Sequence, residues 1–145
     1  MILLELLNSS TDFRVTKNTD RDVRTTFESN GRTIEADAEM IRDGIWEFAF
    51  AERKHRHSRF DLSSSKLNVT GSGGELEVFS TIVEIMKMII KEKSPTELRF
   101  TAEKSEASRV KLYDKLINRI KVPGYDTEID KTASDYRVYY SLKKH

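Results

Sequence analysis

Apolar and polar residues alternate along the first half of the chain, and a two-residue period of this kind predicts β-strands. Residues 22–29 follow this alternation, Asn30-Gly31 comes directly after them, and residues 32–40 resume the same pattern. Asn-Gly between two alternating runs favours a type I′ hairpin turn, because both residues tolerate the positive φ that the turn requires. We therefore expect residues 22–29 and 32–40 to pair as antiparallel strands.

A second turn and a third strand follow. Asp43-Gly44 is again a turn signal, and an apolar run from Ile45 to Phe50 comes next, so three consecutive strands form a meander. Alternation places the acidic residues of the middle strand together on the face opposite its apolar side chains. These residues are Glu35, Asp37 and Glu39.

The second half of the chain changes to a helical period. Apolar residues three and four positions apart draw a stripe through residues 75–93, and Ser94-Pro95 ends this helix. A short strand at 97–102 and a second amphipathic helix capped by Ser105 follow, and the chain closes with strand-like runs at 125–129 and 136–142. We expect the helix 75–93 to connect a strand at Leu67–Thr70 to strand 97–102 by a right-handed parallel crossover.

This order of elements predicts an α+β fold with a single, mostly antiparallel sheet and two helices. The length of 145 residues is typical of one domain, so residues 1–145 are expected to form a single unit. The second half would follow the order strand, helix, strand, helix, strand, strand.

Composition excludes several classes of protein. The 25 Lys and Arg residues balance 24 Asp and Glu residues, so no overall basic field marks the chain as a nucleic-acid-binding protein. The absence of cysteine removes disulfides, thiolate nucleophiles and cysteine zinc sites. No apolar stretch is long enough to span a membrane, and the first residues do not resemble a signal peptide, so we expect a cytoplasmic protein with no membrane partner.

A glycine-rich segment precedes the first helix and is the most suggestive local feature. Asn68-Val69-Thr70-Gly71-Ser72-Gly73-Gly74 leads from a strand-like run into the helix start, where free backbone N–H groups can bind an anion. The predicted cofactor-binding residues are Asn68, Gly71, Ser72, Gly73 and Gly74. The alternative is a flexible connector, and the segment matches neither the Rossmann nor the P-loop pattern.

The order of elements from residue 22 onward, this glycine segment and Val110-Lys111-Leu112-Tyr113-Asp114-Lys115-Leu116 in the second helix together resemble the GNAT superfamily of acyl-CoA N-acyltransferases. The resemblance implies that the glycine segment binds the pyrophosphate of acyl-CoA and that Tyr113 acts as a general acid. The alternative for Tyr113 is a core residue.

The chain departs from the GNAT pattern in two ways that bear on its chemistry. Asn68 stands where a basic or longer amide side chain is expected, and no helices separate the first two strands. In the superfamily those helices help form the acceptor site. A general base is also needed, and the sequence does not choose among Glu35, Asp37 and Glu39.

A basic cluster follows the third strand of the meander. Arg53, Lys54, Arg56 and Arg59 are predicted to bind a partner, and phosphate groups of a nucleic acid could contact the same loop at residues 53–59. The alternative is a solvated loop. His55 and His57 lack a nearby third ligand, so no metal site is predicted.

A second resemblance is to small uncharacterised proteins of tailed bacteriophages. It rests on Val78–Ile85, Leu98–Glu103, Ser108–Tyr113 and the tyrosine-rich closing strand. It implies a host or virion protein as partner and host cytoplasm as the location. The preferred hypothesis is a non-catalytic, phage-type binding protein that needs no cofactor. The alternative is an acyl-CoA-dependent N-acyltransferase with acyl-CoA as its cofactor.

Overall fold

A computed structural model describes residues 10–53 and 73–145, and side chains from residue 77 onward in the second range. The strands are β1 (Arg14–Asn18), β2 (Asp22–Ser29), β3 (Arg32–Arg42), β4 (Ile45–Arg53), β5 (Glu97–Glu103), β6 (Tyr125–Asp130) and β7 (Arg137–Lys144). The helices are α2 (Gly73–Lys93) and α3 (Ala107–Arg119). The strand predicted at Leu67–Thr70 lies outside the described residues.

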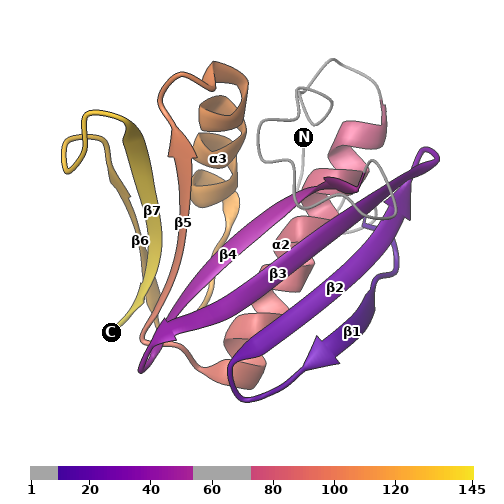
Figure 1. The fold of residues 1–145 in the computed structure, drawn as a ribbon, viewed down its shortest axis with the longest axis horizontal. Coiled ribbons are helices and arrows are strands. Elements are labelled where there is room, and N and C mark those ends of the chain that lie inside the picture. The colour runs from indigo at the N-terminus through magenta and orange to yellow at the C-terminus, as the bar shows by residue number, and fades with distance from the viewer. Residues whose placement is uncertain (1–9, 54–72) are drawn as a thin grey trace.

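The strands form one sheet in the order β1-β2-β3-β4-β5-β7-β6. Every neighbouring pair is antiparallel except β4 and β5, which are parallel. The parallel crossover therefore runs from β4 through α2 to β5 (Figure 1). The α+β fold, the two helices and the mostly antiparallel sheet are confirmed.

The turns that join the meander have the conformation that their sequences predict. Asn30 and Gly31 both have positive φ, at 52° and 73°, and Ser29 pairs with Arg32 across the turn. Gly44, at φ 77°, connects β3 to β4. In residues 10–53 no helix separates the first two strands, and a turn stabilised by the Thr19 hydroxyl joins β1 to β2.

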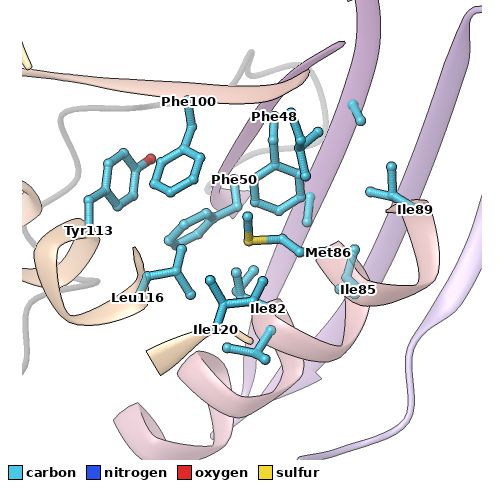
Figure 2. Packing of buried hydrophobic residues seen from close by; sticks show 14 of the residues in the cluster. Phe48, Phe50, Ile82, Ile85, Met86, Ile89, Phe100, Tyr113, Leu116 and Ile120 are labelled. Carbon is cyan, nitrogen blue, oxygen red and sulfur yellow. The ribbon is translucent and has the colours of Figure 1, made fainter. Parts of the chain in front are cut away.

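One face of the sheet holds the core. Alternate residues of β4 and β5 point into it, and apolar residues of both helices complete the cluster, as Figure 2 shows around Phe48, Phe50 and Phe100. Met86 on α2 and Leu116 on α3 lie in the same cluster. Both helices therefore pack against the same face of the sheet, and their amphipathic stripes are buried there.

The ends of the helices agree with the sequence in one case and differ in the other. Ser94 ends α2 with a φ of 43°, and its N–H donates to the carbonyl of Ile90. The prediction that Ser105 caps the second helix is wrong. The turn after β5 is closed by the N–H of Glu106 donating to Glu103, so α3 begins only at Ala107 and has no side-chain cap hydrogen bond.

Candidate functional site

The two parallel strands separate soon after they begin to pair. β4 and β5 are matched at Ile45–Glu97, Trp46–Leu98 and Glu47–Arg99, and within the described residues their pairing stops there. Both strands continue in extended conformation, β4 to Arg53 and β5 to Glu103. The edges that face each other beyond Glu47 therefore carry backbone N–H and C=O groups that have no ladder partner in residues 10–53 and 73–145, and such groups can bind an extended ligand containing amides.

An aromatic cluster packs against the helix side of this divergence. The ring centroid of Tyr113 on α3 lies 5.7 Å from Phe50 of β4 and 5.0 Å from Phe100 of β5. Tyr140 of β7 completes the cluster, 5.5 Å from Tyr113. Figure 2 shows Tyr113 beside Phe100, with the rings of Phe48 and Phe50 on the β4 side. Tyr113 thus contacts both diverging strands at the level where they part.

Within the described part of the chain, an arginine and a glutamate form the polar surroundings of Tyr113. Arg109 Nη1 donates to the Tyr113 hydroxyl at 3.4 Å, and Arg109 Nε lies 3.6 Å from Glu106 Oε2. Burial raises the pKa of Tyr113, and the Arg109 charge opposes that shift. A raised pKa keeps the phenol protonated at neutral pH, and the guanidinium is placed to stabilise a phenolate.

Tyr113 is also a core residue, since its exposed fraction is 2%. The sequence allowed two roles for Tyr113, a core residue or a proton donor. In the structure its ring packs between the two strands. Its role as general acid stays a prediction. Arg109, near the start of α3, is buried as well. The four-residue spacing between Arg109 and Tyr113 on one helix was the signal for their contact.

The opposite face of the sheet carries the three candidate carboxylates, and Asp37 stands out among them. Asp37 lies between Arg24 of β2 and Ala49 of β4 in the cross-strand register. Ala49 is two residues beyond Glu47, the last residue of β4 that pairs with β5. Asp37 is therefore one strand away from the divergence, and its neighbour on that side carries only a methyl group.

The environment of Asp37 favours its protonated form. Desolvation by burial raises its pKa to about 6, with smaller upward contributions from Glu35 and Asp22, while Arg24 and a backbone N–H lower it. Its Oδ1 atom is buried and has no hydrogen-bond partner among the described residues. A partly buried carboxylate with a free oxygen and a pKa near 6 has the properties of a general base.

The other two carboxylates differ from Asp37. Glu35 Oε1 lies 3.3 Å from Arg53 Nε, so this carboxylate is paired. Glu39 is exposed near the start of β4, opposite Glu47. The sequence placed all three residues on one face but could not rank them, because the ranking depends on cross-strand neighbours.

Only part of the predicted anion sites falls within the described residues. Asn68, Gly71 and Ser72 lie outside them, as do Lys54, Arg56 and Arg59. Gly73 and Gly74 form the first two residues of α2. Because α2 runs back from the end of β4 toward the start of β5, its N-terminus lies at the end of the sheet where β4 and β5 diverge (Figure 1). Arg53 is the last residue of β4.

Residues 10–53 and 73–145 contain no group of three or more His, Cys, Asp or Glu side chains that could hold a metal ion. In the same part of the chain, no helix has the length and apolar character needed to cross a membrane.

Comparison with known proteins identifies the fold. No protein-family model and no curated protein sequence matches the chain. The solved structure of spermidine N-acetyltransferase SpeG (F149A mutant) from Vibrio cholerae aligns over 87% of this chain and 68% of its own, with a TM-score of 0.51 and 9% identity. N-acetyltransferase PseH from Campylobacter jejuni aligns over 88% of this chain and 71% of its own, with a TM-score of 0.49 and 17% identity.

The alignment with SpeG confirms a GNAT-like α+β fold. The sequence favoured a non-catalytic binding protein, because Asn68 stands where a basic or longer amide side chain is expected and the helices between the first two strands are missing. That preference is corrected, because this fold is shared with a catalytic N-acetyltransferase. The absence of those helices bears on the acceptor side of the site. The phage resemblance and the partner-binding role of Arg53, Lys54, Arg56 and Arg59 stay predictions.

Proposed function

We propose that this chain is an acyl-CoA-dependent N-acyltransferase. The observation that carries the proposal is the divergence of β4 and β5 after the Glu47–Arg99 pair, with an aromatic cluster on one side and Asp37 on the other. The GNAT-like fold supports this function but does not by itself establish it.

The chain's backbone offers two complementary binding regions for acyl-CoA. The pantetheine arm contains amide groups that match the unpaired backbone edges of β4 and β5. The segment Asn68, Gly71, Ser72, Gly73 and Gly74 would bind the pyrophosphate, since the first N–H groups of α2 lack intrahelical acceptors and the helix dipole favours an anion.

Two side chains would move the protons. Acyl-CoA supplies an acyl group activated as a thioester, which a primary amine of the acceptor attacks with loss of the C–S bond. Asp37 accepts the proton that the attacking nitrogen loses, directly or through one water. Tyr113 donates a proton to the departing sulfur, so the products are an amide and a free thiol. Arg109 stabilises the Tyr113 phenolate until solvent returns its proton.

The first test is calorimetry of the full chain with acetyl-CoA and with CoA. We expect binding of both, abolished by Gly73→Leu because a bulky side chain would cover the helix start. Glu39→Gln is the control and should bind as wild type does. Absence of detectable heat at millimolar acetyl-CoA would refute the proposed function.

The second test separates the two proton-transfer residues from structural ones. With spermidine or lysine as trial amines, release of free thiol reports turnover. Asp37→Asn and Tyr113→Phe should each lower kcat by about 100-fold or more while leaving acetyl-CoA binding intact. Tyr140→Phe, which removes a hydroxyl from the same aromatic cluster, is the matched control for Tyr113. Equal loss in both tyrosine variants would assign Tyr113 to packing alone.

A further inference from the structure

A second pocket lies on the helix side of the sheet, at the C-terminal end of α2. It has a volume of about 420 Å³, within the range of small-molecule sites. Three separate segments line it: the last turns of α2, the α3–β6 connection and the end of β7. Ile90 and Tyr125 supply part of an apolar wall, and the Tyr125 hydroxyl is already used by the carbonyl of Pro95.

The charge around this pocket is entirely positive. Lys87 and Lys91 of α2, Lys121 of the connection and Lys144 of β7 line it, and no carboxylate does. Among the described residues none of these four lysines forms an ion pair. Four lysine side chains line one concave surface, so an anion bound among them would offset their mutual repulsion.

At the end of β7, Lys144 differs from the residues on either side of it. Lys143 pairs with Glu128 at 3.1 Å, and His145 lies 2.9 Å from Asp126. Lys144, between them, has no ion pair and lies on the pocket side of the sheet. The acidic residues of β6 therefore contact the residues on either side of Lys144, whereas Lys144 itself lines the pocket.

The helix dipole accounts for only part of the cluster. A lysine in the last turn of a helix is favoured by the partial negative charge there, which explains Lys91. Lys121 and Lys144 belong to a connection and a strand, where no such dipole acts on their own element. Both nevertheless line the same pocket as Lys87.

We propose that this pocket binds a small polyphosphate-bearing ligand. Ammonium groups act as point charges for phosphate oxygens, and four of them match an anion of several charges. The pocket is separate from the proposed acyl-CoA site, because Lys87 is 14 residues along α2 from Gly73, which is about 20 Å. Concavity and volume favour a small molecule over the extended backbone of a nucleic acid.

The test uses inorganic tripolyphosphate and the full chain, with calorimetry and thermal unfolding at low ionic strength. With saturating CoA present to occupy the glycine segment, we expect one molecule to bind, with a rise in Tm that depends on its concentration. Lys121→Gln and Lys144→Gln should each weaken binding by about three- to tenfold. Lys111→Gln and Lys115→Gln, which remove the same charge from exposed positions of α3, are the matched controls and should change binding by less than about twofold.

The outcomes are distinct from those of the acetyl-CoA test. Saturable tripolyphosphate binding that Lys121→Gln and Lys144→Gln weaken supports the proposal, and prior saturation with CoA should leave it unchanged. Binding that all four lysine variants weaken equally would mean a diffuse charge effect and would overturn it. Binding of a single-stranded oligonucleotide but not of tripolyphosphate would also overturn it.

Discussion

Asp37 should destabilise the folded chain at neutral pH, and replacing it with asparagine tests this directly. The folded state raises the pKa of Asp37 from 3.8 to about 6, chiefly by desolvation. Between these two pH values the folded chain holds a proton that the unfolded chain has released. Stability is therefore greatest below the unfolded pKa and falls as the pH rises through the folded pKa. Asparagine does not ionise, so the Asp37→Asn variant should keep its stability as the pH rises through this range.

The magnitude follows from the size of the shift. A difference of about two pKa units corresponds to about 3 kcal/mol if the site were fully shielded from solvent. Asp37 is only partly buried, so screening by water reduces this to about 1–2 kcal/mol. We expect Asp37→Asn and wild type to have equal free energies of unfolding near pH 4. At pH 8 the free energy of unfolding of Asp37→Asn should be higher than that of wild type by about 1–2 kcal/mol.

Urea denaturation at several pH values between 4 and 8 measures this difference. Asp37→Glu is the control, because it retains a titratable carboxyl at the same position and should lose stability as the pH rises. A constant difference between Asp37→Asn and wild type across the whole pH range would refute the reasoning, since it would show that the effect is not due to ionisation.

Further predictions concern turns and the aromatic cluster. Gly44→Ala should lower the free energy of unfolding by about 2–3 kcal/mol, because Gly44 has φ +77° and an added Cβ would lie 2.7 Å from Thr96 Oγ1. Gly31→Ala is the comparison, since Gly31 has a similar φ of +73° but open space around it. It should lower the free energy of unfolding by about 1 kcal/mol in the same urea assay. Equal losses would show that the Thr96 contact is irrelevant. Tyr140→Phe removes the hydroxyl that donates to Asp114 at 2.8 Å and should lower stability by about 1–2 kcal/mol, measured by thermal unfolding; no change would mean that the Asp114 carboxylate finds an equally good partner.

Local sequence signals predicted the elements of this fold well. The Asn30-Gly31 turn and the stripe of α2 depend on residues close in sequence, so their patterns suffice to locate them. The parallel partner of β5 depends on a long-range contact. The sequence placed that partner at Leu67–Thr70, which lies outside the described residues, and did not predict that the start of β5 pairs with β4. Strand pairing of this kind is not encoded in the period of either strand.

The candidate site was harder to predict for a related reason. Alternation grouped Glu35, Asp37 and Glu39 on one face, but what distinguishes Asp37 is a neighbour on each adjacent strand. The same holds for Arg109, whose burial beside Tyr113 could not be inferred from its place near a polar helix start. Site chemistry depends on desolvation and on partners, and both arise only when distant segments pack together.

The short pairing of β4 with β5 also decides how the two parts of the sheet are joined. Helix α2 packs over β2 and β3, whereas α3 packs over β5, β6 and β7, so each part of the sheet carries its own helix. Among the described residues, three residue pairs join the parts along the sheet, and one continuous hydrophobic core, which contains the Phe50–Tyr113 contact, joins them across it. A ligand that bridges the strand edges beyond Glu47 would add hydrogen bonds between the two parts, and slower amide hydrogen exchange at both edges would record it.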